Sequence, residues 1–364
     1  MFLNYHTLDT LNVLSKQRFR FIGSKFQLLP NIYTELAKRN LINKGNVFFD
    51  AFSGSAIVGA FFKKDFKIVS CDNLYFSYVL QNTLIVLNEI PTFEKLRKTI
   101  NVHNIDDICN YLNSLPGREG FIYKNYTPAS KELCGLERKY FSTSNGKKID
   151  AIRTQLEIWH KSNIINKYEF YYLLTCLLFA VQKVANIAGT YGAFNKFWDR
   201  RALKPLLLKP ITPIHSNFKH KAIYNDVFKV IDCIEGDISY LDPPYNSRQY
   251  IANYHLLETI AKYDSPNIKG ISGIRNYSLE EKSPFCSKKK AKASLLNLCS
   301  KLKFNHVVIS YNNEGILSAK DIEEVLLNAS FRDIDLVKFP HRRFNSNKKG
   351  EKQIVYELLF IGRR

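Results

Sequence analysis

The sequence lacks the cysteine patterns that mark disulfide frameworks and zinc sites. Its seven cysteines are scattered without a CxxC pair, and the count is odd. An unpatterned, odd set of cysteines is typical of reduced thiols in a cytoplasmic protein. We therefore expect a cytoplasmic protein that uses no metal.

Long hydrophobic runs are also missing. The N-terminal stretch MFLNYHTLDTLNVLSKQRF has neither the cationic start nor the unbroken apolar core of a signal peptide. The longest apolar run, Phe170–Val181, is shorter than the roughly 18 to 20 residues that a membrane-spanning helix needs. It predicts a buried helix, and no membrane partner is expected.

Acidic residues are scarce relative to basic ones. Lys and Arg total 53 against 33 Asp and Glu, a formal net charge of +20. Such an excess attracts polyanions, of which nucleic acid is the commonest; a generally basic surface or an anionic membrane surface are the alternatives. The chain of 364 residues is 45% hydrophobic, which excludes a disordered protein and allows one large or two modest domains.

A nucleotide-type βα unit is predicted near the N-terminus. Residues Val47–Phe49 form a short apolar strand, Ser53–Ser55 allow a sharp turn, and a buried helix follows. A second strand, Lys67–Cys71, ends in Asp72, where such folds place an acid that binds ribose hydroxyls. The GxGxxG phosphate-binding spacing is absent, which favours a cofactor that has a ribose but no pyrophosphate.

The run ISYLDPPYNSRQY places an acid, two prolines and a tyrosine after an apolar strand, Ile238–Leu241. Pro243 and Pro244 end the strand and fix the backbone, because proline cannot donate to the sheet. Asp242 and the Pro243 carbonyl would accept both hydrogens of a nucleobase amino group, and Tyr245 would stack on the base. Asp-Pro-Pro-Tyr is also plausible turn composition, so other parts of the chain must decide.

The middle of the chain differs in character from both ends. Residues 91–221 are polar and helix-prone, and we expect them to form an insertion between two halves of one sheet, residues 1–90 and 222–364. Strands are expected to resume at Ile238–Leu241, His306–Ser310, Asp333–Phe339 and Ile354–Gly362. The last two are predicted to form an antiparallel hairpin at the sheet edge.

Four segments in order resemble the Dam-like family of adenine-specific DNA methyltransferases, which includes type II restriction-modification enzymes. They are RFIGSKFQLLPNI at Arg20–Ile32, DAFSGSA at Asp50–Ala56, the variable insertion, and DPPY at Asp242–Tyr245. The resemblance implies a Rossmann-like class I S-adenosylmethionine-dependent methyltransferase sheet, an α/β fold, with an inserted, mostly helical target-recognition domain.

The resemblance also implies cofactor-binding roles. Gly23, Ser24 and Lys25 would hold the methionine carboxylate of S-adenosylmethionine, and Asp50, Phe52 and Gly54 would wrap its methionine portion. Asp72 would bind the ribose, Asp226 would lie near the adenine ring or cap a helix, and Asp242 would adjoin the cofactor. Ala56 replaces the second glycine of the family's FxGxG turn, and its methyl group is tolerable if the backbone φ stays negative.

DNA contacts are expected from basic residues and from an aromatic segment. Tyr191, Phe194, Phe197 and Trp198 alternate with basic residues in a stretch that suits groove contact, filling of the gap left by a flipped base, or an ordinary core edge. Tyr250, Tyr254 and His255 would line the base pocket or stabilise its loop. Lys292 is a further phosphate candidate. The predicted DNA-binding residues are Asn195, Lys196, Arg200, Arg201, Arg248, Lys288, Lys289, Lys290, Arg342 and Arg343.

The resemblance implies transfer of the methyl group of S-adenosylmethionine to adenine N6 in a short site of double-stranded DNA, after base flipping. Asp242, Pro243, Pro244 and Tyr245 would form the catalytic segment. The protein would protect DNA in a restriction-modification system, with a cognate endonuclease acting separately. Methylation of RNA adenine or of DNA cytosine N4, and non-catalytic DNA binding by the same fold, are the alternatives.

Overall fold

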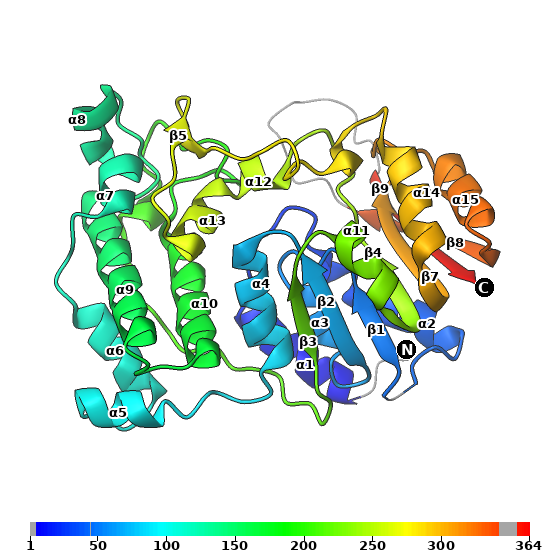
Figure 1. Cartoon of the computed structure of the whole chain (residues 1–364), viewed down its shortest axis with the longest axis horizontal. Coiled ribbons are helices and arrows are strands. Elements are labelled where there is room, and N and C mark those ends of the chain that lie inside the picture. The colour runs from blue at the N-terminus through cyan, green and yellow to red at the C-terminus, as the bar shows by residue number, and fades with distance from the viewer. Residues whose placement is uncertain (1–4, 44, 342–354) are drawn as a thin grey trace.

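The structure, a computed structural model, describes residues 5–43, 45–341 and 355–364. Its centre is a seven-stranded sheet of order β3-β2-β1-β4-β7-β9-β8 (Figure 1). Strand β9 runs antiparallel to both of its neighbours, and the other strands share one direction. The strands are β1 Val47–Asp50, β2 Lys67–Asp72, β3 Lys221–Tyr224, β4 Glu235–Leu241, β7 Lys303–Asn312, β8 Arg332–His341 and β9 Val355–Arg363.

Six strands of this sheet were predicted from the sequence, including the antiparallel pair β8 and β9 at one edge. Strand β3 was missed and falls at the end of the predicted insertion. It has four residues, all of them exposed or half-buried, because it forms the opposite edge of the sheet. A short edge strand has no buried face, so its sequence shows no strong apolar alternation.

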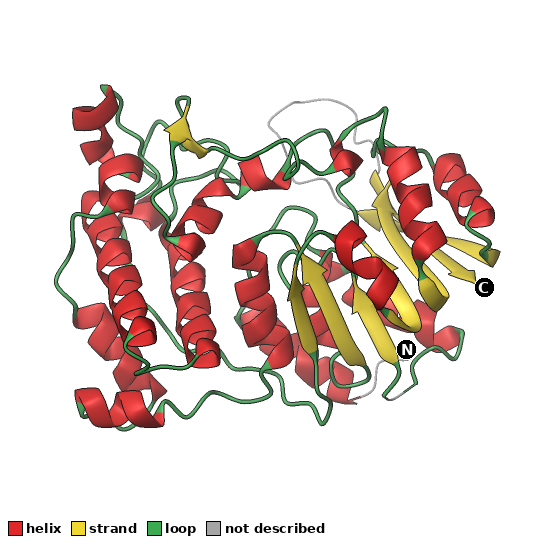
Figure 2. Ribbon diagram, viewed as in Figure 1, coloured by secondary structure: helices red, strands yellow, loops and turns green. Residues whose placement is uncertain are grey.

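Helices cover both faces of the sheet, as Figure 2 shows in red and yellow. One face packs against α1 Tyr5–Lys16, α2 Leu29–Lys38, α3 Ile57–Phe62 and α4 Tyr75–Gln81. The other packs against α11 Val227–Val230, α14 Ala291–Lys301 and α15 Ala319–Asn328. This three-layer arrangement is the doubly wound α/β architecture. Short helical turns are η1 Lys25–Gln27, η2 Asn82–Val86, η3 Pro128–Ser130, η4 Arg200–Leu203, η5 Ile231–Cys233 and η6 Pro284–Cys286.

A second group of helices lies beside the sheet, on the left of Figure 1, and we call it the helical part. It contains α5 Glu94–Ile100, α6 Ile105–Ser114, α7 Phe121–Tyr126, α8 Lys131–Cys134, α9 Thr143–Lys161 and α10 Lys167–Val184. The buried helix predicted at Phe170–Val181 is the core of α10, which begins at a capping box formed by Asn166 and Glu169. None of the helices among the described residues is long and apolar enough to cross a membrane.

Residues that follow β4 also join the helical part. They form α12 Tyr250–Asn253, α13 His255–Lys262 and a small hairpin of β5 Ile268–Lys269 and β6 Ile274–Arg275. The Arg153 Nε of α9 donates to the Ile260 carbonyl at 2.8 Å, and the Tyr126 hydroxyl donates to the Gly273 carbonyl at 2.7 Å. The helical part is therefore built from two separate stretches of chain.

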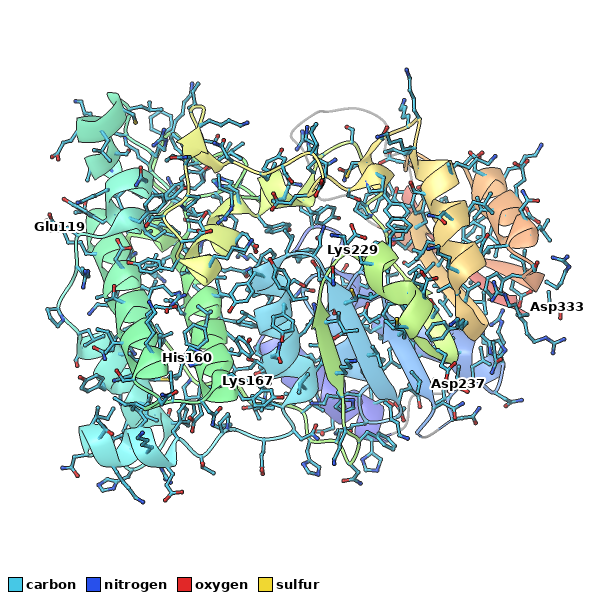
Figure 3. The ribbon with its side chains drawn as sticks, viewed as in Figure 1. Glu119, His160, Lys167, Lys229, Asp237 and Asp333 are labelled. Carbon is cyan, nitrogen blue, oxygen red and sulfur yellow. The ribbon has the colours of Figure 1, made fainter. Side chains whose placement is uncertain are left out.

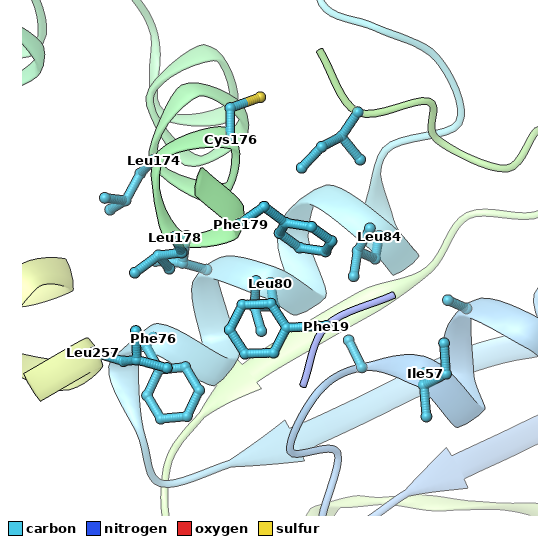
Figure 4. Close-up of a cluster of buried hydrophobic side chains, with 14 of the residues drawn as sticks. Phe19, Ile57, Phe76, Leu80, Leu84, Leu174, Cys176, Leu178, Phe179 and Leu257 are labelled. Carbon is cyan, nitrogen blue, oxygen red and sulfur yellow. The ribbon is translucent and has the colours of Figure 1, made fainter. Parts of the chain in front are cut away.

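One apolar core continues from the sheet into the helical part. Figure 4 shows Leu174, Leu178 and Phe179 of α10 against Leu80 of α4 and Phe19. These five side chains are all buried, and they belong to a single cluster that also includes sheet residues. The helical part is thus packed on the sheet through hydrophobic contact, which stabilises its position.

Candidate active site

A cavity opens where β1, β2 and β4 end, the edge at which open α/β sheets bind ligands. Its empty volume, including its open mouth, is about 1010 Å³. The residues that line it come from the start of η1 and the chain before it, the β1–α3 turn, the ends of β2 and β4, and the segments that follow β3 and β4. They include Gly23, Ser24, Lys25, Phe52, Gly54, Asp72, Asp226, Tyr240, Asp242, Pro244, Tyr250 and Phe285.

The β1–α3 turn forms one wall of the cavity. The Asp50 carboxylate accepts a hydrogen bond from the Ser53 hydroxyl at 2.9 Å, and burial raises the pKa of Asp50 to about 7. Asp50 is absent from the cavity lining, so it organises the turn from behind, while Phe52 and Gly54 face the cavity. Gly54 has a φ of +50°, and a Cβ there would lie 2.8 Å from Phe21 Cε1. Glycine is therefore required at this position.

Ala56 adopts the left-handed conformation with φ +63°, so the condition of a negative φ is not met. A non-glycine residue in this region costs about 1 to 2 kcal/mol. The Ala56 side chain is fully buried in the apolar core and does not line the cavity. Its methyl group therefore strains the backbone without narrowing the cofactor space.

Two carboxylates lie at the ends of β2 and β3. Asp72 accepts from the Gly54 amide at 2.8 Å and the Leu74 amide at 2.9 Å, and burial raises its pKa to about 6. A carboxylate has acceptor sites beyond these two, so Asp72 retains the capacity to bind ribose hydroxyls. Asp226 caps α11 by accepting from the Phe228 amide at 2.8 Å and also lines the cavity. The two interpretations of Asp226 are thus compatible.

Lys25 is buried and contacts protein groups on several sides. Its Nζ lies 2.9 Å from Asp242 Oδ1, 2.8 Å from Glu357 Oε1 and 3.2 Å from the Gly23 carbonyl. An ammonium has three protons to donate. The structure therefore places Lys25 on Asp242 and Glu357, and leaves no proton for the methionine carboxylate that the sequence resemblance implied.

Asp242 and Tyr245 follow β4. Asp242 lines the cavity, whereas Tyr245 is not part of the lining. Burial raises the pKa of Asp242 to about 6, with the Lys25 charge lowering it and the Glu357 charge raising it. The Tyr245 ring lies with its centroid 5.7 Å from Lys25 Nζ, and its hydroxyl would be 3.4 Å from a Cβ on Gly23. Pro243 is buried and Pro244 lines the cavity. The tetrapeptide is thus held rigidly, with its carboxylate in the pocket.

One buried polar atom in the lining, the Ser24 hydroxyl, has no partner among the described residues. Buried polar groups without partners are rare in native proteins and call for a ligand or water. The cavity also has apolar walls of Phe52, Phe228 and Phe285, which suit a flat ring. These features fit a cofactor with a nucleoside and a polar amino-acid tail, as S-adenosylmethionine has.

Sequence reasoning missed several residues of the site. Glu357 lies on β9, Phe285 comes from η6, and Gln249 exchanges two hydrogen bonds with the Ser283 backbone at 3.2 and 2.8 Å. Segments 249–251 and 281–285 are thereby tied together over the cavity. The sequence offered one signal for these missed residues: Glu357 is an acid inside an otherwise apolar strand.

The predicted DNA-binding residues fall into three groups. Lys196, Arg200, Arg248, Lys288, Lys289 and Lys290 are exposed, and Asn195 is half-buried. Arg201 donates to the Ala185 carbonyl at 3.1 Å, and Lys292 contacts Asp321 and Glu324 at 2.7 and 2.6 Å, so both bind within the protein. Arg342 and Arg343 lie outside the described residues.

The residues of the aromatic segment, and the three residues Tyr250, Tyr254 and His255, differ in how deeply they are buried. Phe197 is 85% exposed, whereas Tyr191 and His255 are buried. The His255 Nε2 lies 2.8 Å from the Tyr191 carbonyl, and the Tyr254 hydroxyl accepts from the Ile22 amide at 2.6 Å. Tyr254 and His255 therefore stabilise the loop, and Tyr250 alone of this trio lines the cavity.

The end of β4 that is distant from Asp242 carries an acid that contacts the protein backbone. Asp237, labelled at the lower end of the sheet in Figure 3, accepts from the Val47 amide at 2.8 Å and joins β4 to β1. Within the described residues, no cluster of three His, Cys, Asp or Glu side chains has metal-binding geometry. The seven cysteines are all free thiols.

Residues 21–325 match the D12 class N6 adenine-specific DNA methyltransferase family. The chain is 42% identical over 345 residues to the type II methyltransferase M.FokI of Planomicrobium okeanokoites, covering 94% of this chain and 52% of that protein. It is 37% identical over 349 residues to the modification methylase StsI of Streptococcus sanguinis, covering 95% and 52%.

The chain thus spans about half the length of these two relatives. It is also 41% identical over 332 residues to the type II methyltransferase M.NlaIII of Neisseria lactamica, covering 90% of this chain and 93% of that protein. The match to the family extends from the chain before η1, through the β1–α3 turn, to Asp242 and beyond. The chain belongs to the D12 class of N6 adenine-specific DNA methyltransferases.

Proposed function

We propose that this protein transfers the methyl group of S-adenosylmethionine to adenine N6 within a short site of double-stranded DNA. The observation that carries the proposal is the placement of Asp242. Its Oδ1 is held by a buried lysine, and its side chain faces a cavity whose other walls suit a nucleoside cofactor. Oδ2 receives no hydrogen bond from any described residue and is left for the substrate.

The residues of the tetrapeptide have separate tasks in this reaction. Asp242 Oδ2 and the Pro243 carbonyl accept the two amino hydrogens of adenine and draw its nitrogen lone pair out of the ring. Tyr245 stacks on the base and holds the nitrogen in line. Such alignment carries much of the rate enhancement. No strong base is needed, because the nitrogen loses its proton to solvent after it has accepted the methyl group. When bound, S-adenosylmethionine supplies an electrophilic methyl group on a sulfonium that leaves readily.

The cofactor would be held by residues along the cavity. Gly23, Ser24 and Gly54 provide close backbone approach and a free hydroxyl, and Asp72 accepts from the ribose. Phe52 and Asp226 flank the adenine side. Ser24 supports this assignment, because its buried hydroxyl needs a partner that the described residues do not provide.

Duplex DNA would contact the exposed basic residues on both sides of the cavity, with the helical part serving as the target-recognition domain. Because the target adenine is inaccessible inside a helix, it must be flipped into the cavity. Phe197 is the exposed aromatic of its segment and is suited to enter the gap left behind.

Restriction-modification is the biological setting that we propose. Relatives named type II methyltransferases and modification methylases support it. A cognate endonuclease would then act separately on the unmethylated site. The cytoplasmic location remains a prediction from the sequence.

The test is transfer of labelled methyl from S-adenosylmethionine to unmethylated duplex DNA, with nucleoside mass spectrometry of the product. N6-methyladenine is expected. N4-methylcytosine, or label in RNA alone, would support the alternative methyltransferase functions. DNA binding without any methylation would support a non-catalytic DNA-binding protein.

A further inference from the structure

Glu357 is a buried acid that the site described above does not otherwise use. It lies in β9 between Tyr356 and Leu358, and its side chain is 8% exposed. Its Oε1 contacts Lys25 Nζ at 2.8 Å and accepts from the Ser310 hydroxyl of β7 at 3.2 Å. A buried carboxylate is costly unless it is paired and hydrogen-bonded, and one of the partners of Glu357, Lys25, lines the cavity.

Lys25 joins Glu357 to Asp242. One ammonium contacts both carboxylates, at 2.8 and 2.9 Å. If Lys25 faced Asp242 alone, its whole charge would draw electron density from that carboxylate and weaken Oδ2 as an acceptor. A second carboxylate on the same ammonium reduces this effect.

We propose that Glu357 is a positioning residue for methyl transfer: by sharing Lys25, it keeps Asp242 both fixed through Oδ1 and strongly accepting through Oδ2. The role in transfer rests on the proposed function, whereas the coupling of Glu357 to Asp242 through Lys25 does not. The direction of the pKa effects agrees with the geometry, since the Glu357 charge raises the pKa of Asp242 and the Lys25 charge lowers it.

Other charged and titratable groups also face Asp242, and they remain in place when Glu357 is changed. They are Lys25 from η1, Asp50 from β1, Tyr240 from β4, and Tyr245 and Tyr250 from the chain that follows. Glu357 contacts Lys25 from β9, so replacing it removes one charge and changes one partner of Lys25 while this set stays in place.

The first readout requires no methyl transfer. The unfolding free energies of the wild type and of Asp242→Asn are compared from pH 4 to 8, because their difference changes through the pKa of Asp242. The same pair is then measured in the Glu357→Gln background. We expect the pH at which this difference in unfolding free energy is half changed, its midpoint, to fall by about one unit, since Lys25 then acts on Asp242 alone.

The second readout is the pH dependence of kcat for transfer to duplex DNA. In Glu357→Gln, we expect kcat at pH 8 to fall about tenfold. The acid limb of the pH profile of kcat should move to lower pH, as the midpoint of the stability difference does. The KM values for DNA and cofactor should stay within about twofold, because Glu357 would touch neither. Glu357→Asp keeps the charge and should leave the limb near its wild-type position.

Glu35→Gln is the matched control. Glu35 is a buried glutamate on α2 that is paired with Lys38 and Arg39, and it is absent from the cavity lining. Its replacement should change stability without moving the acid limb. If Glu357→Gln does not fold, Ser310→Ala takes its place. Without the Ser310 hydroxyl, the Glu357 carboxylate draws more of the Lys25 charge, so the limb should move to higher pH by a smaller amount.

The outcomes separate the two proposals. A fall in kcat with no movement of the midpoint or the acid limb would reduce Glu357 to a structural role and overturn the inference. Unchanged kcat would do the same. If the wild type methylates no nucleic acid but the midpoint moves, the proposed function fails and the coupling of Glu357 to Asp242 stands.

Discussion

Asp150 in the helical part and Asp242 at the end of β4 are both largely buried carboxylates with opposite surroundings. Asp150 accepts from the amides of Gly120, Ile122 and Tyr123 at 2.7 to 3.1 Å and from the Tyr263 hydroxyl at 2.8 Å. Asp242 is held through one oxygen, and its other oxygen faces a cavity. A carboxylate with all its partners in the protein builds structure, whereas one left incomplete is available for chemistry.

Removing the incomplete carboxylate should have the largest effect on function. In Asp242→Asn, we expect methyl transfer to fall at least about 100-fold, because one of the two acceptors for the amino hydrogens is lost. DNA affinity should remain within about threefold. Initial rates and equilibrium DNA titrations measure the two quantities.

Asp237→Asn is the control on the same strand, since Asp237 binds the Val47 amide at the far end of β4. Its rate should stay near that of the wild type. A normal transfer rate in Asp242→Asn would contradict the catalytic assignment.

Removing the complete carboxylate should instead affect stability. Asp150→Ala leaves three amides and one hydroxyl without their buried acceptor, so we expect a loss of about 3 kcal/mol in unfolding free energy. Urea titration measures it. Asp106→Ala, at an exposed position in the first turn of α6, should be nearly neutral. Equal losses in both variants would remove the distinction between the two kinds of aspartate.

Asp50 is a third buried aspartate to compare with Asp150 and Asp242, and it has one side-chain partner, Ser53. Its folded pKa of about 7 exceeds the usual 3.8, so the folded state binds this proton more tightly than the unfolded chain does. Stability from this group therefore falls as pH rises from about 4 to 7.

Asp50→Asn should consequently be more stable than the wild type at pH 8, and the gain should vanish near pH 4. The pKa difference limits the gain in unfolding free energy to roughly 4 kcal/mol. We expect about half of this gain, because the asparagine amide is a weaker hydrogen-bond acceptor for the Ser53 hydroxyl than the carboxylate is. Thermal unfolding at the two pH values is the measurement. A gain that is the same at both would contradict the raised pKa.

The smallest expected effects are on DNA binding, and they concern lysines just before and within α14. Lys288, Lys289 and Lys290 are exposed, whereas Lys292 contacts Asp321 and Glu324. Alanine at the first three should reduce the log–log salt slope of DNA binding by up to about 0.9 for each phosphate contact that is lost. Lys292→Ala should leave the slope unchanged. A decrease from Lys292→Ala alone would reverse the assignment.

The parts of the site that the sequence predicted are local in the chain. The turn at Ser53–Ser55, the acid Asp72 after β2 and the tetrapeptide at Asp242 each combine a strand with the residues directly after it, and six of the seven strands in the main sheet were found in the same way. Local hydrophobic pattern and turn chemistry are sufficient for such units.

The missed features depend on contacts between distant segments. The partners of Lys25 are acids far along the chain, and their pairing follows from β4 and β9 lying on either side of β7. The left-handed backbone at Ala56 could not be predicted, because alanine rarely adopts it without tertiary packing. The recruitment of α12, α13 and the β5–β6 hairpin to the helical part likewise depends on side chains such as Arg153 and Tyr126.

The continuous apolar core between α10 and α4 has a mechanical consequence (Figure 4). A hinge between the helical part and the sheet would have to break that packing and expose buried leucines and phenylalanines to water. This packing therefore opposes hinge motion between the two regions. Under the proposed function, adjustment during recognition would fall to surface loops and to the duplex itself, whose sequence-dependent stiffness would then contribute to the choice of site.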